Sequence, residues 1–305
     1  MKVYYEQTDI TDVVQVRECT VHDTAGRRCD SLNIEFENAA VWDRWSPQED
    51  DRIAVTESAY DSGIMYVNTV QDENGRYRIY ATSLPCKARN RGYFAYKEKT
   101  LEDILRHCAA VSNMDFGAYG VDLSLVIPYI ERDNEGCAAF LSRLLALEGA
   151  VLKCINGKYA AIGLEYAQSI PVRSTAEITT KQKGLQYHRS GMTLKKLTVA
   201  SPYASATAED TAVDSSHVTL TKSCLPVMDN VQAGRWARGL LLHHNRECEQ
   251  IYMTQKFNAG LTAMTRMDIL SSTAANGAWI VEDVEHDLKN LKTSALLRPC
   301  ITTIR

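Results

Sequence analysis

The chain has 305 residues, enough for two or three small domains, and its 34 basic and 38 acidic residues leave a formal net charge of −4. This near balance gives no overall electrostatic pull toward nucleic acid or an anionic membrane, and a hydrophobic share of 45% is ordinary for a folded protein. The N-terminal segment lacks a cationic stretch followed by an apolar core, and no apolar run approaches the roughly 20 residues of a membrane helix. We therefore expect a protein that is made in a cytosol and stays there.

Cysteine usage favours a reduced protein. The nine cysteines are scattered, and no two of them have the C-x-x-C spacing; they are Cys19, Cys29, Cys86, Cys108, Cys137, Cys154, Cys224, Cys248 and Cys300. An odd number at irregular spacing argues against both a disulfide framework and a zinc knuckle. Most of them lie on apolar stripes, where a free cysteine behaves as a small hydrophobe.

The segment from residue 11 to about 83 alternates polar and apolar residues with a period of two. In SLNIEFEN, Leu32, Ile34 and Phe36 alternate with polar neighbours, which is typical of a strand with one buried face. Further short strands follow, separated by the turn-forming stretches YDSG and DENG. This pattern predicts a small β-barrel or sandwich.

The stretch VWDRWSP interrupts these strands. Its two tryptophans, Trp42 and Trp45, are expected to plug the end of a barrel, because large aromatic side chains fill such spaces. The alternative is an exposed pair that marks a subunit contact.

Helical spacing begins near residue 96. The stretch KTLEDILRHCAAVSN carries apolar residues at helical spacing from Leu101 to Cys108, and Thr100 with Asp103 forms a capping-box arrangement at its start.

A second helix and a hairpin follow in RDNEGCAAFLSRLLALEGAVLKCINGKYAAIGL. Asp133 or Asn134 is expected to cap this helix, and Gly149 to end it. Asn156 and Gly157 accept the positive φ angles of a type I′ turn, so the strands around them should form a hairpin. This unit is too small to stand alone and must pack on something.

The last region mixes strands with one helix. MTLKKLTVAS and SHVTLTKS are predicted strands on either side of PYASATAEDTAVDS, which is expected to be a mobile loop. An amphipathic helix, NVQAGRWARGLLLHHNRECEQ, comes next, followed by long alternating segments. Trp279 and Val281 lead into a closing hairpin whose returning strand is TSALLR.

The six residues HHNREC pose the question of a metal site. A catalytic zinc needs three converging protein ligands, yet His243 and His244 are neighbours that point about 100° apart on a helix. His244 and Cys248 share a helix face, and His286 is the only further ligand in strongly folded sequence. The alternative to a structural protein is therefore a metal-dependent hydrolase using His243 or His244, Cys248 and His286.

An amphipathic helix packed on a sheet explains the same residues more simply. The expected buried stripe is Trp236, Leu240, Leu241, His244 and Cys248, and the residues expected off it are Arg235, Arg238, Asn245, Glu249 and His243. We favour this interpretation, and so we expect no catalytic residue, no metal site and no cofactor.

Other signals are weaker still. His286 lies among four acidic residues in VEDVEHDLKN, but on a strand these alternate faces. His107 and Cys108 are adjacent on a helix and do not face each other. No G-x-S-x-G, Walker or G-x-G-x-x-G motif occurs. The basic, aromatic segment 86–99 is interpreted as an exposed loop or a subunit contact, without specific nucleic-acid binding.

Three motifs together resemble the phage late control protein D family, the tail hub proteins of contractile-tailed phages and related particles. FAYKEKTLEDILRHCAAVSNMDF resembles the family's helix entry. A helix pattern of the family matches at Asn134, Glu135, Phe140, Leu141, Arg143, Leu144, Glu148 and Gly149. The closing hairpin resembles its Trp–x–Val–x–x–Val–x–His pattern at Trp279, Val281 and His286. The motifs span about 95 to 298, whereas residues 1–95 match only in strand pattern.

The resemblance implies an α+β, mainly β fold of two tail-tube-like β-barrels joined by a small helix–helix–hairpin domain. The first barrel would be 1–95, the connector 96–175, and the second barrel, with one amphipathic helix, 176–305. Three chains would form a ring whose six barrels continue the six-fold tail tube, while its three-fold end seats a spike. Barrel edges would be completed by neighbouring subunits.

The partners implied are other copies of the chain in a homotrimer, a tail tube protein, a central spike protein, and other baseplate or tape-measure proteins, without a membrane. The particle would be a contractile phage tail or a phage-tail-like bacteriocin, assembled in the host bacterial cytoplasm. Related type VI secretion spike proteins continue beyond the hub, whereas this sequence ends at Arg305, so we expect the spike to be a separate chain. A monomeric β-rich adaptor module is a further alternative.

Overall fold

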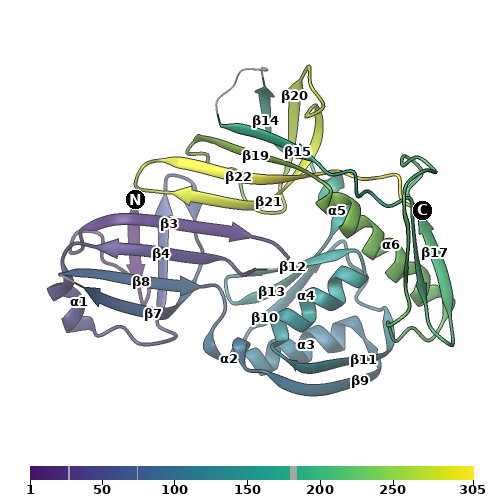
Figure 1. Cartoon of the computed structure of the whole chain (residues 1–305). Coiled ribbons are helices and arrows are strands. Elements are labelled where there is room, and N and C mark those ends of the chain that lie inside the picture. The colour runs from purple at the N-terminus through teal and green to yellow at the C-terminus, as the bar shows by residue number, and fades with distance from the viewer. Residues whose placement is uncertain (27, 74, 179–183) are drawn as a thin grey trace.

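The computed structural model describes residues 1–26, 28–73, 75–178 and 184–305 (Figure 1). Strands account for 47% and helices for 20%, so the expected α+β, mainly β class is confirmed. Figure 1 shows one β region at the left and another at the top; one short helix lies at the left edge, and the other helices are gathered below and to the right.

The first β region is an antiparallel sheet. Its strands are β1 (Lys2–Tyr5), β2 (Thr8–Asp9), β3 (Val16–Thr24), β4 (Ser31–Phe36), β5 (Arg52–Glu57), β6 (Tyr60–Asp61), β7 (Met65–Glu73) and β8 (Arg76–Thr82). They follow the order β3-β4-β8-β7-β5-β1-β2, and β6 pairs with β5. In β4 the predicted burial of Leu32, Ile34 and Phe36 is confirmed, but Glu35, which was expected on the polar face, is buried as well. Asn74, in the predicted DENG turn, lies outside the described residues, as does Arg27 between β3 and β4.

Helix α1 (Ala39–Trp45) closes one end of this region. Trp42 is fully buried, with its ring centroid 4.6 Å from that of Phe36 and 5.4 Å from that of Tyr77. Trp45 stacks on Tyr5 at 5.8 Å. Trp42 is therefore part of the core of this region and the half-buried Trp45 packs against it, but the described residues do not form the closed barrel whose end the two tryptophans were expected to plug.

The middle of the chain, which includes the connector predicted for 96–175 and the segment that leads into it, contains most of the helices. Its elements are α2 (Cys86–Arg89), β9 (Gly92–Thr100), α3 (Leu101–Ser112), β10 (Asp115–Tyr119), β11 (Val126–Glu135), α4 (Cys137–Leu147), β12 (Ala150–Ile155), β13 (Lys158–Gly163) and α5 (Leu164–Ser169). The predicted cap of α3 is confirmed, since Thr100 Oγ1 accepts from the Asp103 N–H at 3.1 Å. The hairpin turn is also confirmed, with φ of 50° at Asn156 and 68° at Gly157.

Two local predictions in the connector are wrong. Gly136, and neither Asp133 nor Asn134, is the N-cap of α4, because β11 continues through Glu135 in its pairing with β9. For the segment 86–99, the loop expected as one of two alternatives is wrong, because the segment forms α2 and most of β9, whose backbone pairs with β11; the other alternative, a subunit contact, stays a prediction.

The third region contains the remaining strands and the longest helix. They are β14 (Val172–Ile178), β15 (Leu185–Arg189), β16 (Lys196–Ala200), β17 (Ser205–Glu209), β18 (Thr219–Lys222), α6 (Asn230–Glu247), β19 (Glu249–Lys256), β20 (Arg266–Ser271), β21 (Gly277–Asp287) and β22 (Lys292–Pro299). The predicted helix and closing hairpin are confirmed. The expected mobile loop is wrong in part, because its middle forms β17, the partner of β16.

The buried stripe of α6 also differs from the prediction. Asn245 and Arg246 are buried, although the former was expected off the stripe, and His244 and Leu240 are only half-buried. The physical reason is that α6 is covered on two sides: α4 packs against one, and the small sheet β17-β16-β18 against the other.

Strand β21 joins the two β regions. It pairs with β22 along its length, while its other edge pairs first with β20 and then, from Asp283 to Asp287, with β3. A register shift between Val281 and Asp283 marks the change of partner. One 14-stranded sheet therefore runs through both regions, and among the described residues its order ends at β15 and β2 without closing into a barrel.

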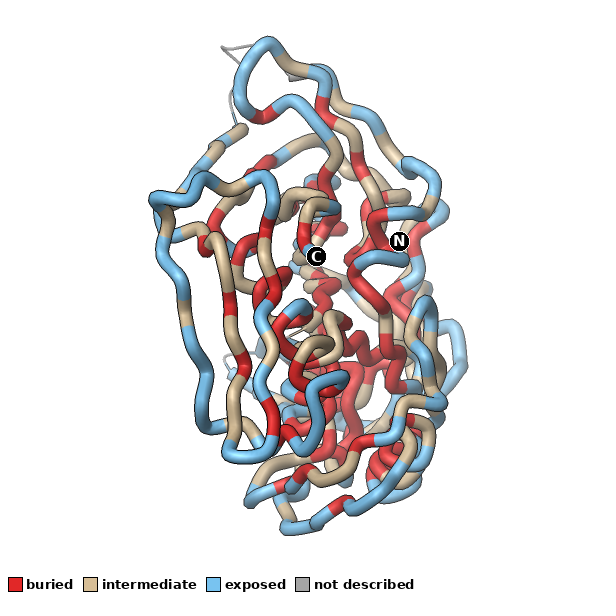
Figure 2. The backbone as a smooth tube through the Cα atoms, turned by 90° about the vertical axis from the view of Figure 1, so that its right-hand side faces the viewer, coloured by how far each residue is buried: buried red, intermediate tan, exposed pale blue. Residues whose placement is uncertain are grey.

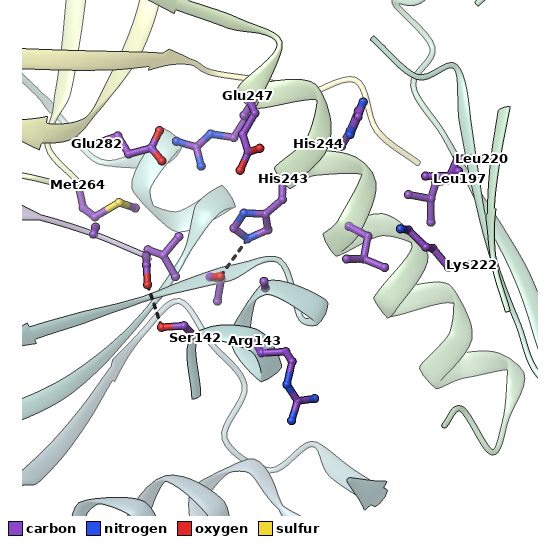
Figure 3. Close-up of a pocket in the computed structure, with 17 residues that line it drawn as sticks. Ser142, Arg143, Leu197, Leu220, Lys222, His243, His244, Glu247, Met264 and Glu282 are labelled. Atoms are coloured by element: carbon purple, nitrogen blue, oxygen red, sulfur yellow. Dashed lines mark hydrogen bonds between the residues drawn. The ribbon is translucent and has the colours of Figure 1, made fainter. Parts of the chain in front are cut away.

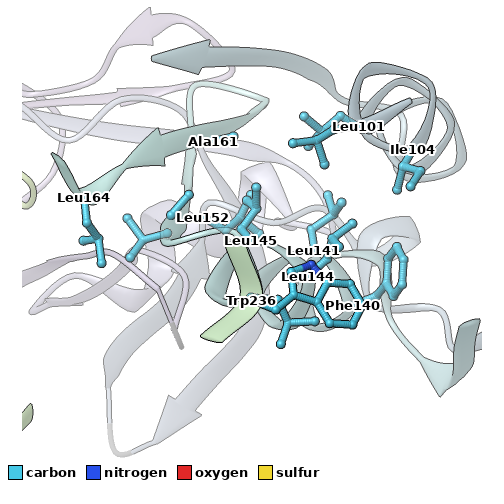
Figure 4. Close-up of a cluster of buried hydrophobic side chains, with 14 of the residues drawn as sticks. Leu101, Ile104, Phe140, Leu141, Leu144, Leu145, Leu152, Ala161, Leu164 and Trp236 are labelled. Atoms are coloured by element: carbon cyan, nitrogen blue, oxygen red, sulfur yellow. The ribbon is translucent and has the colours of Figure 1, made fainter. Parts of the chain in front are cut away.

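Buried side chains form three clusters, which follow the first β region, the connector with α6, and the last hairpins. Figure 2 shows the buried backbone running through the centre of the molecule with exposed turns around it. In the connector cluster, side chains of α3, α4 and the β12–β13 hairpin meet Trp236 of α6 (Figure 4). Leu288, in the turn after β21, belongs instead to the cluster of the first β region.

No helix of the described residues is long and apolar enough to cross a membrane.

Candidate functional site

The HHNREC segment lies at the C-terminal end of α6, where each histidine bonds a different backbone carbonyl. His243 Nε2 donates to Ala150 O of β12 at 3.0 Å, and His244 Nε2 donates to Met192 O at 2.9 Å. Figure 3 shows the two rings leaving α6 in different directions. Cys248 Sγ donates to the carbonyl of His244 within the same turn of helix. These bonds attach α6 to the connector and to the turn before β16.

His286 of β21 lies away from the HHNREC segment, where β21 and β22 meet the first β region. Its side chain is fully buried, with Nδ1 3.0 Å from Thr293 Oγ1 and Nε2 3.1 Å from Leu261 O, and its ring lies 4.4 Å from that of Tyr60. Burial lowers the pKa of His286, which favours the neutral ring. The structure therefore does not bring His286 to the HHNREC segment. Among the described residues, no group of three or more His, Cys, Asp or Glu side chains could hold a metal ion.

A cavity of about 430 Å³ opens beside His243, where the connector, α6, the small sheet and the β3–β4 turn meet (Figure 3). Ser142 of α4 lies on its floor and donates to Gly26 O at 2.8 Å. The wall also includes Arg246, which is only 4% exposed. Sequence reasoning missed this arginine. The spacing of the helix could have revealed its burial: Leu242 comes three residues after Gly239, and Arg246 four residues after Leu242, so all three lie on one face of α6.

Glu148, at the end of α4, fixes this end of the connector to α6. Its Oε2 accepts from Arg235 Nε at 3.0 Å, and its Oε1 accepts from Trp236 Nε1 at 2.8 Å. The backbones also come close here, because a Cβ added at Gly239 would lie 2.2 Å from Leu147 O.

A buried charge cluster fixes the connector to the first β region. Lys153 of β12 pairs with Asp23 of β3 and with Asp30, whose Oδ2 lies 3.1 Å from Lys153 Nζ. Burial raises the pKa of Asp30 to about 7, although Lys153 opposes the shift. Such a cluster holds two segments in one arrangement, because separating them would leave a buried charge unpaired.

Two thiols form a third polar cluster inside the connector. Arg132 Nη1 donates to Cys137 Sγ at 2.6 Å, and the Tyr96 hydroxyl lies 3.4 Å from Cys108 Sγ and 2.8 Å from His107 Nδ1. The hydrogen bond from Cys108 lowers the pKa of Cys137 to about 6 against the effect of burial. Both sulfur-bearing residues are at most 1% exposed, so the cluster offers no access to a substrate.

Comparison with known proteins found fold relatives only. No protein-family model and no curated protein matches the sequence. Among solved structures, the chain is similar to a tail protein from Neisseria meningitidis MC58, with a TM-score of 0.74 and 11% identity over 98% of this chain and 95% of that one.

Two further structures have the same fold. The 43 kDa tail protein of prophage MuSo2 from Shewanella oneidensis gives a TM-score of 0.71 at 10% identity, over 100% of this chain and 99% of that one. The E. coli c3393 protein gives 0.58 at 12% identity, over 94% and 74%; it is a type VI secretion component with structural similarity to the T4 bacteriophage tail proteins gp27 and gp5. The resemblance inferred from the sequence motifs is confirmed at the level of structure: over nearly its whole length, the chain has the fold of phage tail proteins.

Proposed function

We propose that this chain is the structural hub of a contractile phage tail or of a phage-tail-like bacteriocin. Three copies form a ring that binds the six-fold tail tube on one face and a central spike on the other. The ring adapts one symmetry to the other and acts as a rigid conduit, with no chemistry of its own. It is assembled in the host cytoplasm and becomes part of the particle's tail or baseplate.

The observation that carries this proposal is the near-complete structural match to two phage tail proteins. The match includes the connector as well as both β regions, since it covers at least 98% of this chain in each case. The likeness to a type VI secretion component supports the spike-facing role, because that component is itself similar to gp27 and gp5.

The open sheet supports assembly with other copies. In the described residues β15 pairs only with β19, and β2 only with β1, so both end strands have an edge without a partner strand. A free edge is a template for pairing with another chain. In the ring, residues 1–95 and 176–305 are the two tube-like barrels, 96–175 is the connector, and neighbouring copies complete the barrels.

The internal attachments support a rigid conduit. The shared strand β21, the Lys153 cluster and the Glu148 contacts join the connector to its neighbours on both sides. A chain built from independent modules would lack such buried connections.

Negative-stain electron microscopy of the purified chain tests the proposal. Class averages with three-fold symmetry and a central hole are expected, alone or after addition of the tail tube protein. Compact monomers under both conditions would favour an adaptor module. Stoichiometric zinc in protein purified without a histidine tag would favour the metal-dependent hydrolase.

A further inference from the structure

Lys153 of β12 is a buried amine that lies between two buried carboxyl groups. Its side chain is 7% exposed, against 8% for Asp23 of β3 and 3% for Asp30, which precedes β4. Lys153 Nζ donates to Asp23 Oδ1 and lies 3.2 Å from Asp30 Oδ1 and 3.1 Å from Asp30 Oδ2. It also donates to the backbone carbonyl of Thr24 at 3.2 Å. One carboxylate is enough to neutralise one amine, and a second carboxylate buried beside the first is costly, so the arrangement is more than a simple ion pair.

The second carboxyl allows the amine to lose its charge inside the cluster. Burial raises the pKa of Asp30 to about 7, so this carboxyl holds a proton below neutral pH. Burial opposes the charge on Lys153, although the two carboxylates raise the pKa of its amine above the usual value. Transfer of one proton along the hydrogen bond from Lys153 to Asp23 turns that ion pair into a free amine and a carboxylic acid, with no change in net charge. The cluster then holds a neutral nucleophile beside two neutral acids.

The fold holds the three groups together and keeps bulk water away from them. Asp30 Oδ1 also accepts from the Thr24 N–H at 2.9 Å, which fixes this carboxyl beside the amine. Leu152 and Cys154, the neighbours of the lysine in β12, are 2% and 4% exposed. Groups that a folded chain holds in contact have a very high effective concentration, and a site without water does not return an amide to its acid and amine.

Other titratable side chains near the cluster do not take part in its hydrogen bonds. Tyr60, His286 and Asp283 lie close enough to be affected by the charge of Asp23. Among the described residues, none of the three hydrogen-bonds a member of the cluster, and His286 bonds Thr293 and a backbone carbonyl instead. The proton of the amine therefore has two direct side-chain acceptors, and both are carboxyl groups.

We propose that Lys153 and Asp23 condense to an amide, so that the chain cross-links its connector to its first β region. Lys153 Nζ attacks the Asp23 Cγ atom, and a C–N bond forms. Asp30 gives its proton to the departing hydroxyl group of Asp23 and takes one proton from the nitrogen. One C–O bond breaks, one water molecule leaves, and Asp30 ends in the protonation state in which it began. The step needs no oxidant, reductant or other reactant.

The contacts of the two carboxyls assign their different roles. Both oxygens of Asp30 lie near Nζ, so one can give a proton while the other takes one. Asp23 hydrogen-bonds the amine through Oδ1 alone and is the group attacked. The link joins residues 130 positions apart and would hold the two regions together even in the unfolded chain.

Intact mass spectrometry of the purified full chain tests the cross-link. We expect a mass lower than that of the sequence by one water molecule, and a digest that contains two peptides joined through Lys153 and Asp23. On a denaturing gel the native chain should migrate ahead of Lys153→Met, because a loop that spans 130 positions stays closed. Lys153→Met, Asp23→Ala and Asp30→Ala should each have the full mass of their sequence.

Lys195→Met is the matched control. Lys195 Nζ also lies near a carboxylate, 3.1 Å from Glu209 Oε1, but the Glu209 side chain is 40% exposed, so this pair stays ionic in water. The variant should keep the mass deficit of the native chain.

A full sequence mass in the native protein would overturn the inference. So would a deficit that persists in Lys153→Met, because an aspartate can also lose water by closing on its own backbone. A link through Asp30 would overturn the roles assigned to the two carboxyls. The native measurements need no variant to fold and no ring to form, so their result is separate from that of the proposed tail role.

Discussion

Gly239 of α6 lies directly against the Leu147 carbonyl at the end of α4. A Cβ added at Gly239 would be 2.2 Å from Leu147 O and 2.6 Å from Gly149 N, distances at which backbone must move. The absence of a side chain thus allows the two helices to approach at the point where the connector meets the last region. Arg235 and Trp236, one turn earlier, hold Glu148 at the same junction.

Gly239→Ala is therefore expected to destabilise the protein by about 1–3 kcal/mol, the usual cost of overpacking, even though alanine is the better helix former. Urea unfolding followed by circular dichroism measures this difference. Gly234→Ala, in the same helix, is the control: its Cβ would meet only Ala206 Cβ at 3.8 Å. That variant should be neutral or stabilised by up to about 1 kcal/mol, and equal effects at both positions would contradict the explanation.

Leu144→Asp should abolish soluble protein. Leu144 is fully buried in the connector cluster, and an aspartate there would be a charge without a partner. The measurement is the soluble fraction after expression. Val111→Asp on α3, at a side chain that is 40% exposed, should stay soluble. Soluble, folded Leu144→Asp would mean that the connector does not depend on this core.

The features that were predicted correctly from the sequence are those that a few neighbouring residues determine. The cap at Thr100, the turn at Asn156 and Gly157, and the apolar spacing of α4 are each set by neighbouring residues. Strand β17 was missed because SATAE is small and polar, and it covers α6 instead of forming a large apolar core.

The pattern of apolar and polar residues could not predict which distant strands pair with each other. Strand β3 pairs with β21, about 260 positions later, and no local alternation encodes that partner. The burial of Arg246 has the same origin, because the segments that cover it are distant in sequence. The two histidines each bond a backbone carbonyl, a contact that the spacing of the segment did not predict, and the arginine beside them was overlooked.

His286→Ala and His244→Ala should differ in cost. The first removes a fully buried ring together with its bonds to Thr293 Oγ1 and Leu261 O, at a cost of about 2–4 kcal/mol. The second removes one bond to Met192 O on a half-buried ring, at about 1 kcal/mol. Guanidinium unfolding measures both. A His244→Ala protein that folds normally but loses a hydrolytic turnover or bound zinc would instead support the metal-dependent hydrolase.

Asp30 should make stability fall as the pH rises. Its pKa is raised to about 7 by burial, so between about pH 4 and 7 the folded protein holds a proton that the unfolded chain has released. The stabilisation is complete below the unfolded pKa and is lost as the pH approaches 7. His286 acts in the opposite direction, because its lowered pKa favours unfolding as the pH falls below about 6.5.

The two effects are separated by comparing melting temperatures of the native protein and Asp30→Asn from pH 4 to 8. Asparagine keeps an acceptor for the Thr24 N–H, now 2.9 Å from Asp30 Oδ1, and leaves the Lys153–Asp23 pair in place. The native protein should lose stability relative to the variant as the pH rises through this range. Parallel curves would show that Asp30 stays ionised beside Lys153, and the cluster would then act as a fixed ion triad with no titration in this range.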